Sequence, residues 1–334
     1  MKPALIDVSV LLIFFNRPYL FRHVFEQIKI ARPSRLFLYQ DGPRNDNDIK
    51  GIEECRKIAL DIDWECEVHT KFQEKNVGCD PSEYLADTWA FSLTDKCIIL
   101  EDDCVPSQSF FQFCKEMLDR YEYDDRVWMI SGFNHEEISH WTKDDYFFTD
   151  TMCISGWATW KRVIDSWDSK YSFLDNPEKI EYLKKLIKEK KTRKDFIEFC
   201  KSHRNSGREH YETILWSSML LNNGVAVMPR KNLINNIGTV PDSTHTTSPA
   251  KMLPRAVRKV FTMNRHELSF PLVHPLSIEP SEHYHKVFFK SNGWGYPLTK
   301  VGRSFEELFL NLRYGNFSNI GKSIASRFKK IFKF

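Results

Sequence analysis

Three carboxylates stand side by side directly after an apolar segment: Glu101, Asp102 and Asp103 in "IILEDDCVPS", residues 98–107. Adjacent like charges repel one another, and an apolar strand does not need them in order to fold. Mg²⁺ and Mn²⁺ take oxygen ligands and leave positions open for phosphate oxygens. The run therefore predicts a divalent cation that neutralises the acids and bridges a diphosphate. The alternative is a solvated acidic cap, because acids ahead of Ser107 also suit the N-terminus of a following helix.

The segments around these acids alternate between strand and helix patterns. Short apolar runs are bounded by turn residues, and longer segments with helix-start signals lie between them. Asp80 is the expected N-cap of one of these helices. We expect strands within residues 8–18, 35–44, 64–72, 96–100, 127–134 and 225–229, and helices over 18–31, 48–60, 80–93, 107–121 and 211–224. This order predicts an α/β fold, with a mostly parallel sheet flanked by helices and a C-terminal helical extension.

A polar turn follows each of the first four strands. In parallel sheets, ligands bind beyond the carboxyl ends of the strands. We therefore expect the four turns to converge on one edge of the sheet. They are Asn16-Arg17, Gln40-Asp41-Gly42, Asn76-Val77-Gly78 and Glu101-Asp102-Asp103.

Charge is nearly balanced over the 334 residues, with a formal net charge of +3. This excludes a strongly basic molecule, and we expect no nucleic-acid partner. Basic residues gather instead at the C-terminus, in "IGKSIASRFKKIFKF", residues 320–334. Apolar residues recur there at helical spacing, so residues 318–334 predict a basic amphipathic helix that binds an anionic membrane surface. The alternative is a terminal helix that docks on its own domain.

The eight cysteines are scattered and form no CxxC pair, which argues against a structural zinc site. Several lie in apolar runs, as expected of buried thiols in a reducing cytoplasm. The N-terminus lacks the features of a signal peptide, and no apolar stretch reaches the length of a membrane span. We expect a cytoplasmic protein that is peripheral on the inner face of the cytoplasmic membrane.

The segment "IILEDDCVPSQSFFQF" resembles the metal-binding segment of GT-A fold glycosyltransferases. It is similar to the acidic motif of N-acetylglucosaminyltransferase I and of a bacterial family 2-like group of sugar transferases. "LLIFFNRP", "LFLYQDGPR", "EKNVGC", "GWATWKR" and "NLINNIG…STHT" occur in the same order as in that bacterial group. The resemblance covers residues 8–247. It implies a GT-A (Rossmann-like) sheet and a nucleotide-sugar donor.

The resemblance also implies roles for the acids and for the first turn. Asp103 would ligate the metal ion directly, Asp102 would face the donor ribose or sugar, and Glu101 would support the metal site from the strand end. Asn16 and Arg17 would approach the nucleotide. The alternative for Arg17 is a surface charge at a helix start, where a cation opposes the helix dipole.

Two further turns belong to the implied donor site. Asp41 would hydrogen-bond the base or the ribose, and Asn76 would lie beside the donor. The alternative for Asp41 is a turn residue, because "QDGP" is favourable turn chemistry. The alternative for Asn76 and Gly78 is a plain turn.

Three residues of the second half complete the expected site. Glu212 in "REHYETILW" is the candidate general base, and the alternative is a first-turn acid on a helix. Trp157 and Trp160 in "GWATW" would share one face of a helix or turn, with Trp160 in the core and Trp157 forming a wall of the donor or acceptor site. His245 in "DSTHTT" would contact the metal ion or the diphosphate, and the alternative is a solvated loop residue.

The expected activity is that of a metal-dependent, inverting glycosyltransferase with a UDP-type donor and Mn²⁺ or Mg²⁺. Its acceptor would be a saccharide, including one linked to undecaprenyl diphosphate, in bacterial capsule or O-antigen synthesis. The rivals are a sugar nucleotidyltransferase and a non-catalytic glycan-binding relative. We expect a catalytic domain over 1–250, with a nucleotide-sugar half (1–134) and an acceptor half (135–250), then an extension over 251–317 and the tail 318–334.

Overall fold

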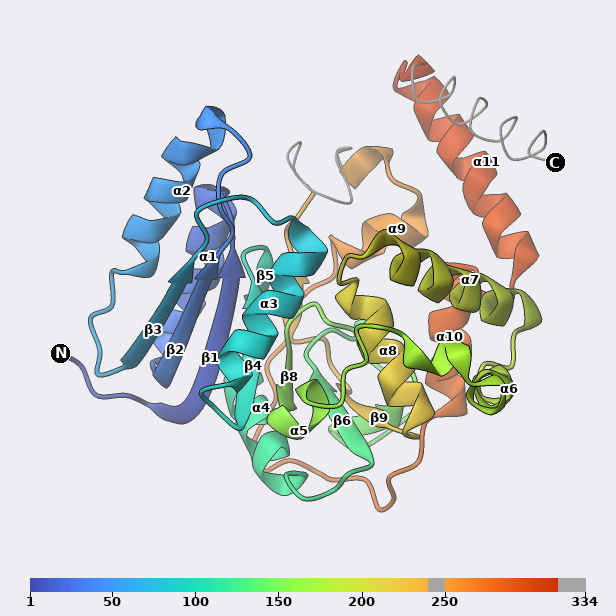
Figure 1. Ribbon diagram of the computed structural model, residues 1–334, viewed down its shortest axis with the longest axis horizontal. Coiled ribbons are helices and arrows are strands. Elements are labelled where there is room, and N and C mark those ends of the chain that lie inside the picture. Colours follow the sequence, from blue (N-terminus) through green and yellow to red (C-terminus); the bar gives the residue numbers. More distant parts are fainter. Residues whose placement is uncertain (240–249, 318–334) are drawn as a thin grey trace.

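One sheet, eight-stranded within the described residues, forms the centre of the protein (Figure 1). The computed structural model describes residues 1–239 and 250–317. The strand order is β3-β2-β1-β4-β8-β6-β9-β7. In these residues β7 and β8 run against the other six strands, so the mostly parallel α/β sheet is confirmed. The bounds are β1 Ile6–Phe14, β2 Pro33–Gln40, β3 Glu67–Phe72, β4 Lys96–Glu101, β6 Val127–Ser131, β7 Tyr146–Thr149, β8 Trp157–Trp160 and β9 Val225–Pro229.

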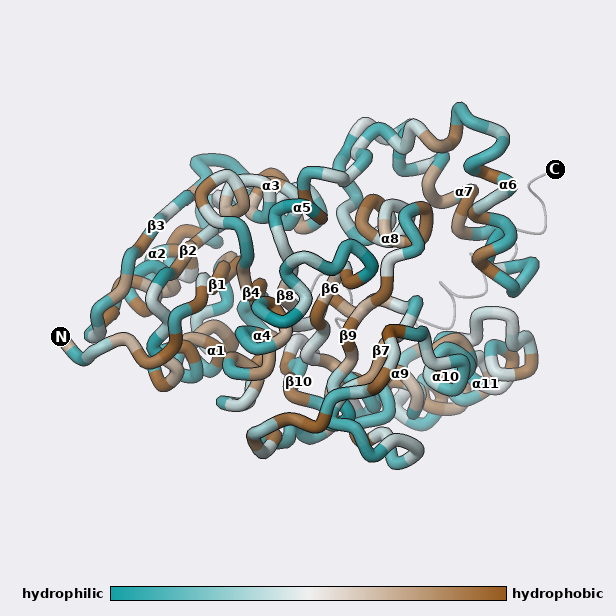
Figure 2. Tube along the Cα trace, turned by 90° about the horizontal axis from the view of Figure 1, so that it is seen from below, coloured by the Kyte–Doolittle hydropathy of each residue, from teal (hydrophilic) through white to brown (hydrophobic). Residues whose placement is uncertain are grey.

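Helices flank this sheet and form the C-terminal extension, as expected. Figure 2 shows α3 and α5 on one side of the first strands and α1 and α4 on the other. No helix in residues 1–239 and 250–317 is long and apolar enough to cross a membrane. The bounds are α1 Pro18–Ala31, α2 Asp46–Ala59, α3 Cys79–Phe91, α4 Gln108–Arg120, α5 Lys161–Ile164, α6 Pro177–Leu186, α7 Lys190–Ser206, α8 Tyr211–Leu221, α9 Arg255–Val260, α10 Glu282–Asn292 and α11 Pro297–Arg313.

The start of α3 differs from expectation. Asp80 lies inside the helix, and Gly78 occupies the N-cap position with a φ of 93°. That left-handed conformation suits glycine because it has no Cβ. The expectation of an Asp80 cap was therefore wrong.

β1 is apolar because it is covered on all sides. It pairs with β2 and β4, and helices lie over both faces of the sheet. Val10, Leu11 and Leu12 are 0% exposed. Burial of each such side chain contributes about 1.5–3 kcal/mol. The strand therefore holds the turn at its carboxyl end, with Asn16 and Arg17, in a defined position.

"GWATW" forms β8, which lies antiparallel between β4 and β6. The expected helix or turn was wrong, and two side chains three positions apart on a strand point to opposite faces. Trp157 is 1% exposed and Trp160 is 3% exposed. β8 also places residues of the expected acceptor half inside the sheet of the nucleotide-sugar half.

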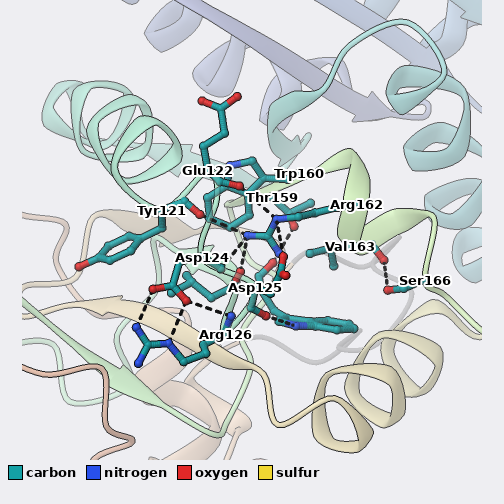
Figure 3. Close-up of polar contacts among 12 residues, drawn as sticks. Tyr121, Glu122, Asp124, Asp125, Arg126, Thr159, Trp160, Arg162, Val163 and Ser166 are labelled. Carbon is teal, nitrogen blue, oxygen red and sulfur yellow. Dashed lines mark hydrogen bonds and ion pairs between the residues drawn. The ribbon is translucent and has the colours of Figure 1, made fainter.

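Arg162 follows this strand and joins α4 to β6 (Figure 3). Its guanidinium donates to the backbone carbonyls of Tyr121, Glu122, Asp124 and Val127 at 2.8–3.3 Å. It also lies 4.5 Å from the ring centre of Trp160. Arg162, at the basic end of "GWATWKR", therefore holds the loop between α4 and β6. This loop lies at the opposite end of β4 from the acidic turn.

His285 on α10 ties the extension to the rest of the protein. Its Nδ1 lies 2.9 Å from the carboxylate of Asp150, and its Nε2 lies 3.4 Å from Glu189. Burial acts to lower the pKa of His285, but its bonds with Asp150 and Glu189 outweigh burial and raise that pKa. The charged imidazole thus stabilises the docking of α10.

Replacing Arg162 with Ala should lower the free energy of unfolding by about 2–4 kcal/mol, because four carbonyls lose a charged donor. Arg126→Ala is the matched control, since it breaks an ion pair with Asp124 in which Arg126 is 64% exposed. It should cost at most about 0.5 kcal/mol. Urea unfolding measures both values, and equal losses would contradict the role given to Arg162.

Stability should also depend on His285 in a defined pH range. The contribution is fully present below the unfolded histidine pKa of about 6.5 and is lost as pH rises through the raised folded pKa. The stability advantage of the natural protein over His285→Gln should therefore be largest below about pH 6.5 and shrink as pH rises from there through the raised folded pKa. Urea unfolding across this range tests it, with His140→Gln, at an exposed histidine, as the control. An advantage independent of pH would refute the role.

Candidate active site

The carboxyl ends of β1, β2 and β4 lie at one edge of the sheet. Ile13 pairs in register with both Tyr39 and Glu101, so the chain leaves the three strands at the same level. A cavity of about 250 Å³ opens there, which we call the strand-edge cavity. The predicted convergence of the four turns is confirmed, because its lining includes Arg17, Asp41, Asn76, Gly78, Glu101 and Asp102.

Arg17 is the cation at this edge. Its Nη2 and Nε donate to the two carboxylate oxygens of Asp102, and its Nη1 lies 3.2 Å from Asp103. Burial acts to lower the pKa of Arg17, but Asp102 and Asp103 outweigh it and raise that pKa. Arg17 is therefore permanently charged and is not a plain surface residue.

The three acids of the run have different surroundings. Asp102 is 2% exposed, and both of its oxygens accept hydrogen bonds from Arg17, with a further one from the amide of Phe15 at 3.4 Å. A contact between Asp102 and a donor stays a prediction. Asp103 is less enclosed, with a side chain that is 14% exposed. Burial, followed by the charges of Asp103 and Asp102, raises the pKa of Glu101 well above its ordinary value.

A small two-stranded sheet directly after Asp103 positions this residue. β5 (Cys104–Pro106) pairs with β10 (Ile234–Asn236), and the amide of Ile237 donates to the carbonyl of Asp103 at 2.9 Å. A Cβ on Gly238 would lie 2.3 Å from Asp103 Oδ2, so a larger residue at this position would displace the Asp103 carboxylate. The "NLINNIG" segment thus reaches the acids. His245 lies outside the described residues.

Two carboxylates on α3 were missed by the sequence analysis. Glu83 lines the strand-edge cavity and is 4% exposed, and Asp87 is 0% exposed one turn later. Burial raises the pKa of both well above the ordinary range, and Glu101 adds to the shift at Glu83. Within the described chain neither oxygen of Asp87 has a hydrogen-bond partner. The available signal was spacing, since positions 82, 83, 86, 87 and 90 form the buried face of α3.

Asp41 acts as a turn residue in the structure. Its carboxylate accepts hydrogen bonds from the side chain of Asn76 at 2.7 Å and from the amides of Val77 and Gly78 at 2.9 and 3.1 Å. Gly42 permits this closure, because a Cβ there would lie 2.5 Å from the backbone of Lys75. The turn alternative for Asp41 and Asn76 is thus observed, and their contacts with a donor stay predictions.

Asn16 is directed elsewhere. Its amide donates to Asp48 of α2 at 2.6 Å, and Asp48 also accepts three hydrogen bonds from Arg44. Those bonds with Arg44 lower the pKa of Asp48 to about 2. The structure therefore gives Asn16 a part in holding α2, and Asn16 is not among the residues that line the strand-edge cavity.

Glu212 lines a second cavity, of about 500 Å³, which we call the aromatic cavity. Glu212 is exposed in the first turn of α8, and its carboxylate lies in the lining of this cavity together with aromatic rings. Aromatic rings offer faces that stack on sugar rings, and a carboxylate can accept a proton from a hydroxyl group. The lining includes Cys153, Phe196, His203, Glu212, Trp216 and Trp294.

The acids of the two cavities lie near enough to interact, because the charge of Glu212 is among the causes that raise the pKa of Glu101. Tyr211 is 5% exposed, and its pKa is raised by burial and by the charges of Glu83, Glu101 and Glu212. Because β8 is antiparallel to β4, it begins at the edge where β4 ends, and the preceding residues 152–155 line the aromatic cavity. Trp157 itself lies in the core and not in the lining of either cavity, so its expected role as a site wall was wrong.

The strand-edge cavity fits a cation electrostatically. Glu83, Glu101 and Asp102 line this cavity together with Arg17, and Asp103 lies beside Arg17. The raised pKa values of Glu83 and Glu101 have this negative field among their causes. Within residues 1–239 and 250–317, however, no group of three His, Cys, Asp or Glu side chains is arranged to hold a metal ion.

No family model matches the chain, and no curated protein matches it. Solved structures match about half of it. One is an inositol-1-phosphate CTP transferase from T. maritima, with 11% identity and a TM-score of 0.30 over 48% of this chain and 73% of that chain. Another is a 4-diphosphocytidyl-2C-methyl-D-erythritol synthase from Anaerococcus prevotii DSM 20548, with 7% identity and a TM-score of 0.28 over 48% and 74%. A third, from Bacillus anthracis, is described as a glucose-1-phosphate thymidylyltransferase, with 9% identity and a TM-score of 0.28 over 51% and 76%. Likeness at this level assigns neither a family nor an activity.

Replacing Arg17 with Met should lower the free energy of unfolding by about 3–5 kcal/mol at neutral pH, because it leaves Asp102 buried without its partner. Adding Asp102→Asn should restore part of the loss by removing the buried charge. The control is Lys115→Met, which breaks a half-exposed pair with Asp119 and should cost about 0.5 kcal/mol or less. Denaturant unfolding measures the free energy of unfolding of each variant. A loss below about 1 kcal/mol for Arg17→Met would contradict a stabilising ion pair between Arg17 and Asp102.

Proposed function

We propose that this protein is a glycosyltransferase that moves a sugar from a nucleotide-diphosphate donor, of the UDP type, to a saccharide acceptor. The observation that supports it best is the proximity of two unlike cavities. One is polar and holds carboxylates and an arginine, and the other is aromatic and holds one carboxylate. The first suits a nucleotide diphosphate and the second suits a sugar.

Arg17 is the proposed diphosphate contact. Arginine has five N–H donors, and three of those of Arg17 face Asp102 and Asp103. Two donors are left for phosphate oxygens at the cavity. Asp102 then acts by holding the guanidinium plane in place, which is the kind of support that fixes a binding group before its ligand arrives.

Mn²⁺ or Mg²⁺ is the proposed cofactor, with Asp103 as ligand and with Glu101 and His245 as further candidates. Such an ion stabilises negative charge on a diphosphate leaving group when it is bound. Asp103 suits this role because its carboxylate is more exposed than that of Asp102. Its contacts with described residues are with Arg17 Nη1 and with Cys104 Sγ.

Glu212 is the proposed general base. The acceptor hydroxyl would attack the anomeric carbon and give its proton to Glu212 while the bond to the diphosphate breaks. Nucleotide diphosphate then leaves on the opposite side of the sugar, which inverts the anomeric configuration. The aromatic rings of the second cavity would hold the acceptor while water is excluded.

The resemblance to bacterial sugar transferases extends the proposal to the biological setting. It supports an acceptor linked to undecaprenyl diphosphate and a role in capsule or O-antigen synthesis. The protein would then work at the inner face of the cytoplasmic membrane, with the tail 318–334 on the anionic surface. That tail lies outside the described residues.

The test is release of nucleotide diphosphate from a panel of UDP- and GDP-sugars with Mn²⁺. Glu212→Gln should lower kcat by about 10²–10⁴-fold with little change in donor affinity, because it removes the base alone. Asp103→Ala should weaken Mn²⁺ binding and lower kcat by about 10²-fold or more. Glu198→Gln, at a carboxylate exposed on α7, is the control and should retain full activity.

Metal removal gives an independent result. Chelation should abolish turnover, and Mn²⁺ should restore it in the natural protein. Full activity of Asp103→Ala would defeat the metal assignment. Pyrophosphate release from a nucleoside triphosphate and a sugar phosphate would identify a nucleotidyltransferase instead, and glycan binding without turnover would identify a binding protein.

A further inference from the structure

A third cavity, of about 1000 Å³, is larger than either cavity of the candidate active site. It lies between α9, α10 and α11, and we call it the basic cavity. Four cationic side chains line it, against two carboxylates. The cations are Arg255, Arg258, Lys259 and Arg303, and the acids are Glu136 and Glu306.

The two acids are engaged by other groups. Glu136 accepts hydrogen bonds from Ser139 at 2.5 Å and from the indole of Trp141 at 2.8 Å, and it lies 3.3 Å from His283. Glu306 accepts the backbone amide of Arg255 at 2.9 Å. Neither acid contacts a lysine or arginine side chain of the cavity in the described chain, and four cations against two carboxylates leave an excess of two positive charges.

The cations lack anionic partners in the described chain. Lys259 donates to the backbone carbonyls of His135 and Glu136, at 2.9 and 3.2 Å. Within residues 1–239 and 250–317, the side chains of Arg255, Arg258 and Arg303 make no ion pair or hydrogen bond. Arg258 and Arg303 are also half-buried. Several unpaired, partly desolvated cations around one hollow attract an anion with several oxygens, such as a phosphate group.

An exposed apolar stripe runs along α11 next to this cavity. Within α11, all of which is described, only Leu310 and Asn311 are buried. The stripe follows the spacing of one helix face, and the residues of α11 that line the basic cavity lie on the neighbouring face. Its members are Leu298, Val301, Phe305, Leu308, Phe309 and Leu312, which are 42–84% exposed. Figure 1 shows α11 projecting from the body of the protein, so this face is not covered by the sheet or its helices.

We propose that the basic cavity and the apolar stripe of α11 together bind the surface of a membrane rich in anionic phospholipids. The phosphate of a lipid headgroup enters the basic cavity, and the stripe enters the boundary between headgroups and acyl chains. The charge of the cavity matches this occupant, and a neutral protein partner would leave the arginines unpaired. The inference concerns residues 255–312 and does not rest on the proposed catalytic activity or on the tail.

Co-sedimentation of the full chain with phosphatidylcholine vesicles, with and without about one third phosphatidylglycerol, tests the proposal. The double variant R258E/R303E should lower the partition coefficient on anionic vesicles by about tenfold or more, because each basic residue contributes about a factor of five. F305S/L312S should lower it by a similar factor, since it removes apolar area. K50E/K57E, with the same change of charge on α2, is the control and should change it by less than about threefold.

Each variant is first shown to unfold at the same denaturant concentration as the natural protein. Unchanged partition of both α11-region variants would overturn the proposal. It would also be overturned if F305S/L312S altered only self-association, measured by light scattering, because the stripe would then join two copies of the chain. Loss of inorganic phosphate binding in R258E/R303E, with unchanged vesicle binding, would identify a site for a free anion. It would overturn the proposal that a lipid headgroup enters the basic cavity.

Discussion

The ion pairing of Arg17 with Asp102 and Asp103 is the constraint on which the candidate site depends. Three adjacent acids at the end of a buried strand would repel one another and weaken the fold. Arg17 leaves β1 at the same edge where the acids leave β4, and it takes both oxygens of Asp102. The charges are therefore not equivalent, since one is neutralised within the protein and Asp103 retains partial exposure.

The antiparallel strand β8 determines where the second half of the site lies. A parallel strand at this position would begin at the opposite edge of the sheet, far from the acids. Because β8 runs against β4, the segment before it lies at the acidic edge, where it lines the aromatic cavity. Tyr211 is buried near the carboxylates of both cavities, and their charges are among the causes that raise its pKa.

The alternation of strands and helices was sufficient to predict the sheet and the meeting of four turns, because both follow from the parallel topology. It did not predict the direction of β8, since "GWATW" is too short to show a period and its pairing depends on distant strands. Glu83 and Asp87 were missed because acidic residues on a helix are normally expected to face solvent, whereas these two are buried. The functions of Asp41 and Asn16 were ambiguous for a different reason: their partners, Asn76 and Asp48, are separated from them by more than thirty residues.

The two cavities of the site are built from separate stretches of the chain. Residues between Ile13 and Asp102 line the strand-edge cavity, and residues between Met152 and Trp294 line the aromatic cavity. The strands β1, β2 and β4 belong to the first stretch, whereas the second cavity is bounded largely by helices and loops. Amino-acid replacements in the aromatic cavity can accumulate without disturbing the acids or Arg17. Such a layout would let the shape of the aromatic cavity change while the ion pairs at the sheet edge stay in place.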